Sequence, residues 1–207
     1  MNRQKKAHPI GRKPLSLHAV SWSLSRLKPR EPELLDATFL SAGRALYLAN
    51  EFESKCQFVL RISNLIAIVE DDPVLGLQEA ISLLPGEKML GPTLKDLTQH
   101  TLGGFGSQDI GVLDKARKGR NFIAHEGAAI GVMWAAKSNQ ILDHIIRLRA
   151  AVADLAHGDN LISQWCHGIE EPKESLPRFF IEAYPSMIDE WVFGHFGELL
   201  DALDSGD

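Results

Sequence analysis

The sequence predicts an all-α fold, and two observations lead to this prediction. In several long segments, apolar residues recur at three- and four-residue steps, which is the spacing of one helical face. No segment alternates apolar and polar residues with a period of two, and no hairpin dipeptide separates two β-branched runs. Hydrophobic residues make up 44% of the 207 residues, a share ordinary for a packed globular protein, so disorder throughout the chain is not expected.

The first half of the chain predicts one long helix and two short ones. The long helix should run from Pro32 to the Asp71-Asp72-Pro73 signal, either unbroken or with a slight break. A shorter helix is expected around residues 73–84, and Thr93 resembles an N-cap for a helix over residues 93–102. The GGFG stretch at 103–106 predicts a loop. The apolar face of the long helix consists of Leu35, Phe39, Ala42, Leu46, Ala49, Cys56 and Leu60.

The second half predicts three further helical segments. Ser107 is expected to cap a helix that reaches about Gly127, with Asp109 in its first turn. A long amphipathic helix should cover residues 130–157 and end at Gly158-Asp159, followed by another turn or two. Residues 170–177 have the composition of a linker, and a last helix is expected at about 185–203. The stripe of the 130–157 helix is formed by Trp134, Ile141, Ile145, Leu148, Val152 and Leu155, and that of the last helix by Ile188, Val192, Phe196, Leu199 and Leu203.

Charge is distributed unevenly along the chain. Residues 1–30 carry eight Lys and Arg without any Asp or Glu, whereas residues 170–207 carry ten acidic and two basic residues. The basic extension at 1–30 is either a solvated tail or an arm that contacts nucleic acid. It lacks the continuous apolar core of a signal peptide, and no later run reaches transmembrane length. We therefore expect a cytoplasmic protein without a membrane partner.

The two cysteines, Cys56 and Cys166, are far apart and lack C-x-x-C spacing. This pattern predicts neither a disulfide framework nor a cysteine-rich metal site, so both are expected to be buried apolar residues. His125-Glu126 is not followed by a second histidine at zinc-protease spacing, and the GGFG stretch lacks the Lys-Ser/Thr of a P-loop. No metal and no cofactor is predicted.

Residues 115–126, KARKGRNFIAHE, gather four cations before one histidine in a chain of net charge −5. On a helix Arg117, Asn121 and His125 share a face because they are spaced four apart. Arg120 lies about 140° around the axis from His125 and about 7.5 Å along it. The two side chains converge only if the arginine folds back or a second surface completes the site, which suggests a cleft shared between subunits.

The motif from Arg120 to His125, RNFIAH, resembles the R-x(4–6)-H signature of HEPN domains, including the polar residue directly after the arginine. In that family the motif lies on a later helix of an all-α bundle, after a long first helix and a short helix that often begins Thr-Leu, as at Thr93-Leu94. The resemblance covers roughly residues 33–157. It implies an antiparallel bundle at 31–170, to which 171–207 would add a linker and an extra acidic helix.

By this resemblance, the protein is expected to be a metal-independent endoribonuclease that works as a homodimer and leaves 2′,3′-cyclic phosphate ends. His125 would be a general acid or base, Arg120 would bind the phosphoryl oxygens, and Asn121 would orient His125 or the phosphate. Lys115, Arg117 and Lys118 would contact the RNA backbone. Many such enzymes are toxins of toxin–antitoxin or phage-defence systems, so an antitoxin protein is a further expected partner.

Two alternatives remain open at this stage. Some HEPN domains keep the fold and act only as nucleotide-binding or protein-interaction modules. The residues of the motif also have a purely structural interpretation, in which His125 stabilises the end of its helix and Arg120 pairs with an acid such as Asp114 or Glu126. For a dimer, the small Ala116 and Gly119 beside the motif are expected to permit a close approach of two helices.

Overall fold

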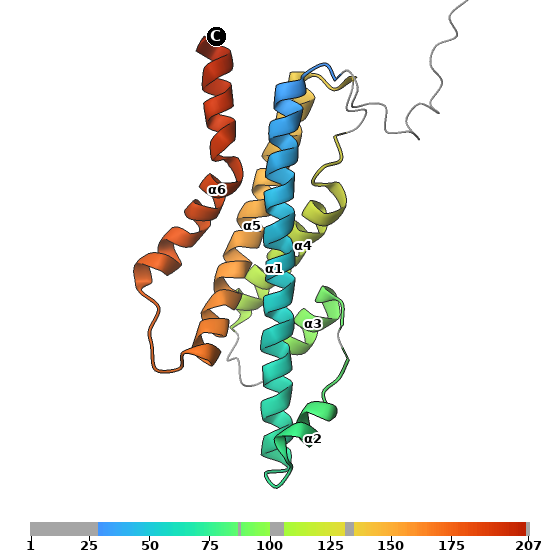
Figure 1. Cartoon of the computed structure of the whole chain (residues 1–207), viewed down its shortest axis with the longest axis vertical. Helices are drawn as coiled ribbons and strands as arrows, with labels where there is room; N and C mark the ends of the chain where they lie inside the picture. Colours follow the sequence, from blue (N-terminus) through green and yellow to red (C-terminus); the bar gives the residue numbers. More distant parts are fainter. Residues whose placement is uncertain (1–28, 87, 100–105, 131–134, 206–207) are drawn as a thin grey trace, which may run out of the picture.

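The computed structural model describes residues 29–86, 88–99, 106–130 and 135–205, with side chains as far as Gly197. Within these ranges the regular elements are six α-helices, and none of the described residues forms a strand (Figure 1). The predicted all-α fold is confirmed. None of the described helices is both long and apolar enough to cross a lipid bilayer.

Helix α1, Pro32–Asp71, is the central element, and all five other helices contact it (Figure 1). It begins with a proline at its first turn and runs for 40 residues without the break that the sequence left open. Ala45, Ala49, Phe52 and Cys56 are fully buried on one side, so small residues let the neighbouring helices approach α1 closely. Leu46, expected on the buried face, is 42% exposed.

The two short helices differ from the sequence prediction. Helix α2, Leu77–Ser82, is shorter than expected, and α3 spans Leu90–Leu97. Thr93 was predicted to be an N-cap, but it is buried inside α3 and its hydroxyl donates to the carbonyl of Met89 at 3.0 Å. That prediction is wrong, because the hydroxyl bonds back to the preceding turn instead of receiving a free N–H at a helix start.

Helix α4, Ser107–Glu126, has almost the predicted extent. Its N-cap is Gly106 and not Ser107, which is the first helical residue. As expected, Asp109 lies in the first turn, where its carboxylate accepts a hydrogen bond from the N–H of Gly106 at 3.0 Å. The helix ends directly after His125, so the whole RNFIAH motif lies on its last turns.

Helix α5, Ser138–Glu170, starts later than predicted and continues through the expected break at Gly158-Asp159. Both residues serve the packing of the long helix. A Cβ at Gly158 would lie 2.2 Å from that of Ala116, so only glycine permits this contact with α4. The Asp159 carboxylate is fully buried and accepts two hydrogen bonds from Lys55 Nζ, at 3.0 and 2.9 Å. Trp134, which the sequence placed on this helix, lies outside the described residues.

Residues 171–177 connect α5 to α6, Arg178–Ser205, so the last helix begins seven residues before the expected Pro185. A proline inside a helix leaves the carbonyl four residues earlier without its usual partner. Here that carbonyl belongs to Ile181, and it accepts a hydrogen bond from Asn160 Nδ2 of α5 at 2.7 Å. The ribbon of α6 bends along its length (Figure 1).

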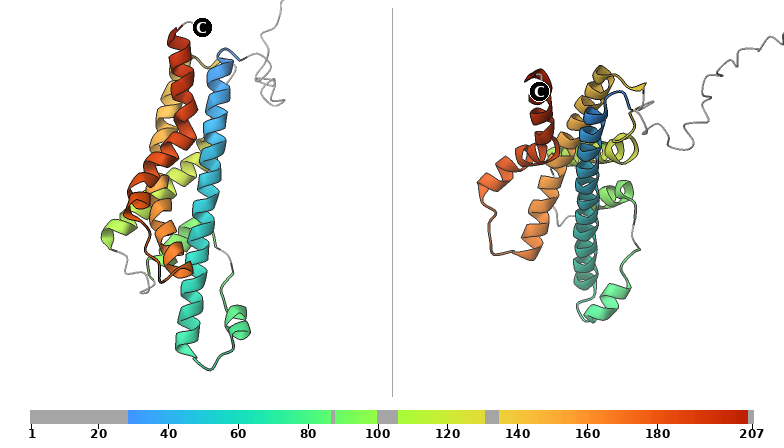
Figure 2. Two further views of the ribbon diagram at one scale, coloured as in Figure 1. Left: turned by 60° about the vertical axis from the view of Figure 1, so that its left-hand side comes forward. Right: turned by 45° about the horizontal axis from the view of Figure 1, so that its top comes forward.

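Helix α6 also belongs to the main core, because Val192, Phe193 and Phe196 are buried in the same apolar cluster as residues of α1 and α5. Figure 2 shows α6 alongside these two helices and α4 crossing α5 obliquely. Through this crossing, α4 is packed on one side while its other side faces α3 and solvent.

Candidate functional site

The helix that carries the RNFIAH motif is held tightly against α5. Ala116 and Gly119 of α4 are buried at this contact, and a Cβ added to Gly119 would lie 2.5 Å from the carbonyl oxygen of Ala151. The sequence suggested that these two small residues allow two subunits to approach. That assignment is wrong, because α5 of the same chain already occupies their face.

The C-terminal end of α4 is fixed by a buried histidine of α5. His144 is 2% exposed, and its Nε2 lies 2.8 Å from the carbonyl oxygen of Gly127. Because a carbonyl can only accept, His144 carries its proton on Nε2, and its Nδ1 can accept the 3.4 Å hydrogen bond from Arg147. The ring of Phe122 packs near His144, with centroids 6.1 Å apart. The last turn of α4 therefore has a defined position.

Arg120 is anchored to α1. Its Nη2 forms an ion pair with Glu53, and its Nη1 donates to the side-chain oxygen of Asn121 at 3.5 Å. The two charged side chains are only 22% and 20% exposed. The buried Nε of Arg120 has no hydrogen-bond partner among the described residues. The guanidinium is thus oriented by Glu53, whereas the structural interpretation of the sequence had expected a pair with an acid such as Asp114 or Glu126.

His125 is exposed on the last turn of α4 and has no hydrogen-bond partner in the described part of the chain. Asn121, one turn earlier on the same face, is half-buried. The helical offset of about 140° between Arg120 and His125 is not removed by side-chain folding, since the guanidinium turns to Glu53 and Asn121. One chain therefore carries both motif residues on the last turns of α4 but directs their side chains to different sides of the helix.

The three cations that precede the motif on α4 differ in their contacts: Arg117 and Lys118 are paired with a carboxylate, and Lys115 is not. Arg117 Nη2 and Lys118 Nζ both bind the carboxylate of Asp114, at 2.8 and 2.7 Å. Their hydrogen bonds, that of Lys118 foremost, lower the pKa of Asp114, so this carboxylate stays charged to more acidic pH. Lys115 is exposed, and it lies about 200° around the helix from Arg117. It therefore faces away from the surface that carries Arg117, Asn121 and His125.

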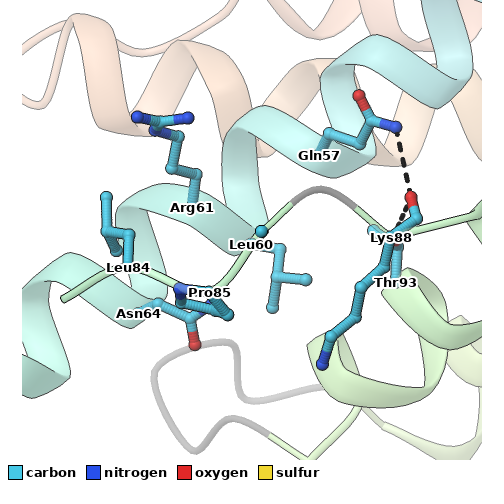
Figure 3. A pocket seen from close by; sticks show the side chains of 9 residues that line it. Gln57, Leu60, Arg61, Asn64, Leu84, Pro85, Lys88 and Thr93 are labelled. Carbon is cyan, nitrogen blue, oxygen red and sulfur yellow. Dashed lines mark hydrogen bonds between the residues drawn. The ribbon is translucent and has the colours of Figure 1, made fainter. Parts of the chain in front are cut away.

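Two pockets lie on either side of α3. The first, of about 80 Å³, is formed by α1 and the segment before α3 (Figure 3). Gln57 and Thr93 both donate there to the carbonyl of Lys88, at 3.4 and 3.3 Å, and the Lys88 ammonium pairs with Asp96. These polar groups mainly fix the backbone. The second pocket, of about 220 Å³, lies between α3 and α4 and has Arg117 at its edge.

Neither cysteine is part of this site. Burial, the largest cause, raises the pKa of Cys166 to about 11 and raises that of the buried Cys56 as well, so both thiols stay protonated at neutral pH. Both cysteines are free. Among the residues that the structure describes, no group of three or more His, Cys, Asp or Glu side chains gathers as a metal site.

Sequence reasoning found the α4 residues but missed their partners. Glu53, His144 and Arg147 lie on α1 and α5, far from the motif in the sequence. For Glu53 the sequence did contain one signal. Its carboxylate follows Phe52 on the buried side of a long amphipathic helix, where an acidic side chain needs a partner.

We compared the chain with protein-family models, with curated proteins and with solved structures, and none of the three comparisons found a match.

Proposed function

We propose that this protein is a metal-independent endoribonuclease of the HEPN type. One observation carries the proposal: an oriented guanidinium, that of Arg120, and an exposed histidine, His125, lie about 7.5 Å apart along the axis at the end of one firmly packed helix. An arginine matches phosphate oxygens, and a histidine exchanges protons near neutral pH. Together they suit attack on a phosphodiester.

In the proposed reaction a ribose 2′-hydroxyl attacks the adjacent phosphorus. A histidine in the role of His125 takes the hydroxyl proton, the bond from phosphorus to the 5′-oxygen breaks, and that oxygen receives a proton. The products are a 2′,3′-cyclic phosphate and a 5′-hydroxyl. Arg120 stabilises the negative charge that builds on the phosphoryl oxygens, and its orientation by Glu53 keeps this help in place before the substrate arrives.

The proposal includes a homodimer. Within one chain the guanidinium of Arg120 turns toward Glu53 while His125 faces outward. A second copy, placed with its own α4 end opposite the first, would bring His125 of one subunit toward the phosphate held by the other. We expect the active protein to sediment as a dimer at micromolar concentration, and a monomer with full activity would contradict this arrangement. In a cell, such an enzyme would act in the cytoplasm as a toxin restrained by an antitoxin protein.

The deciding experiment compares two exposed histidines. His125→Ala should lower the rate of RNA cleavage by about 10²–10⁴-fold, the range of general acid–base help. Because His125 is exposed, the free energy of unfolding should change by less than about 0.5 kcal/mol. His157→Ala, at an exposed position on α5, is the matched control and should leave both quantities unchanged. Purified wild-type protein that cleaves no RNA would refute the proposal.

The alternative class, a non-catalytic nucleotide-binding module, is favoured by a different observation. Arg117, Lys118 and Arg120 are all paired with carboxylates of the same chain, as expected for cations with a structural role. Such a module would bind nucleotides without cleaving RNA, and His125→Ala would change neither binding nor stability. The same pair of variants therefore separates the two functions.

A further inference from the structure

A pocket opens on the face of α4 that carries Arg117, Asn121 and His125. It has a volume of about 220 Å³ and lies between α3 and α4. Arg117 is at its edge, and Asn121 and His125 follow on the same face at four-residue steps. Along the helix axis Arg117 is about 6 Å from Asn121 and about 12 Å from His125. An RNA strand that ran along this face from His125 would meet the edge of the pocket about 12 Å away, at Arg117, and Asp114 about 16.5 Å away.

The floor of the pocket is apolar. Leu94 and Leu113 are buried beneath it, and Ile110 is 42% exposed at its side. An apolar surface beside cationic groups is typical of sites that receive an unstacked nucleobase, because a base offers two flat faces and a polar edge. Because the floor is apolar, the pocket does not suit a phosphate group alone.

The rim supplies both kinds of hydrogen-bonding group. The ammonium of Lys95 has no ion-pair or hydrogen-bond partner among the described residues, so it is available as a donor. Arg117 is a second donor, and the carboxylate of Asp114 is an acceptor. Arg117 donates to Oδ1 through both Nε and Nη2, at 3.3 and 2.8 Å, whereas Lys118 donates to Oδ2 at 2.7 Å. Because each carboxylate oxygen accepts about two hydrogen bonds, Oδ2 can accept one more.

We propose that this pocket binds a guanine base of the RNA substrate, an inference that rests on the proposed ribonuclease function. Guanine presents two acceptors, O6 and N7, which suit arginine and lysine donors. On its Watson–Crick edge it also presents two adjacent N–H donors, one of which suits the open acceptor position on Asp114 Oδ2. Adenine lacks the carbonyl acceptor, and the pyrimidines fill less of the floor. The protein would thus cleave RNA at a fixed short distance from a guanine.

Gly91 of α3 provides a direct test. It lines the pocket, and a Cβ added there would meet nothing within 4 Å, so Gly91→Leu fills the pocket without displacing the backbone. Gly111 of α4 likewise has nothing within 4 Å of its added Cβ, and it does not line the pocket. Gly111→Leu is therefore the matched control, since it adds the same side chain to an exposed helical surface.

The first measurement is binding of guanosine, adenosine, cytidine and uridine monophosphates to the full-length protein by calorimetry. The wild type and Gly111→Leu should bind the guanosine nucleotide about tenfold or more tightly than the other three. Gly91→Leu should lose this preference. Equal affinity for all four nucleotides in the wild type, or a guanosine preference that survives in Gly91→Leu, would overturn the assignment.

The second measurement maps cleavage sites in an RNA of random sequence. A guanine should be enriched at one fixed position beside the cut with the wild type and Gly111→Leu, and the enrichment should vanish with Gly91→Leu. If the wild type cleaves RNA with a base preference that is the same in both variants, the pocket assignment fails while the nuclease stands. If the wild type cleaves no RNA, the proposed function fails, and the nucleotide affinities alone decide the assignment of the pocket.

Discussion

The ion pair between Arg120 and Glu53 gives a quantitative prediction for stability. Arg120→Ala leaves the Glu53 carboxylate, which is 20% exposed, without its partner. Breaking a fully buried pair lowers stability by about 3–5 kcal/mol, and breaking an exposed pair by about 0–1 kcal/mol. With about a fifth of each side chain exposed, we expect a loss of about 1–3 kcal/mol. Arg120→Ala should therefore lower the midpoint of thermal unfolding by several degrees.

The assay is a double-mutant cycle measured by urea unfolding. Arg120→Ala and Glu53→Ala should each destabilise the fold, and the double variant should be less destabilised than the sum of both by about 1 kcal/mol or more. Arg178→Ala is the control, because the Arg178–Glu182 pair is 90% and 62% exposed and its loss should be within about 0.5 kcal/mol of zero.

Additive effects of the two substitutions would refute the reasoning, since they would mean that the pair contributes no interaction of its own. The cycle also changes how activity data must be interpreted at this position. Because Arg120 supports both the fold and the proposed reaction, Arg120→Ala should lose activity beyond its loss of stability, whereas Glu53→Gln should retain part of the activity. His125, which is exposed, allows the simpler test.

Three further predictions follow from packing, proton linkage and mechanism. Gly119→Ala should destabilise the fold by about 1–3 kcal/mol in urea unfolding, because its Cβ would lie 2.5 Å from the Ala151 carbonyl oxygen. Burial, followed by the charge of Asp159, raises the pKa of Tyr184, so the folded state keeps a proton that the unfolded chain releases. Stability should thus be complete below about pH 10 and fall as the pH rises above it, and Tyr184→Phe should weaken that fall. RNA cleavage should persist in EDTA and leave 2′,3′-cyclic phosphate ends, whereas activity restored only by Mg²⁺ would contradict the proposed chemistry.

Local sequence signals predicted those parts of the fold that local physics decides. The Pro32 start and the Asp71-Asp72-Pro73 stop each lie within a few residues of the helix end that they predict, and α1 has these bounds. The end of α4 near Gly127 was predicted on the same grounds. In each case the signal and the element lie in one stretch of chain.

The errors arise where distant contacts override local preference. Gly158-Asp159 has the composition of a helix stop, yet α5 continues because Gly158 admits Ala116 of α4 and Asp159 binds Lys55 of α1. Pro185 looked like a helix start, yet α6 passes through it because Asn160 of α5 takes the freed carbonyl. Neither compensation is visible in the neighbouring sequence, since each partner lies on another helix.

In the candidate site, too, local signals identified some residues while contacts with distant helices stayed hidden in the sequence. The motif residues were found from their spacing on one helix, but the charge state of the site depends on residues that the motif does not contain. Three cations, Arg117, Lys118 and Arg120, are paired with two carboxylates, those of Asp114 and Glu53. In the proposed function, an RNA phosphate would therefore meet cations that are already oriented and partly neutralised. Such pairs hold a guanidinium in place while weakening general attraction to any polyanion, so the proposed site would favour a particular phosphate geometry over non-specific binding of nucleic acid.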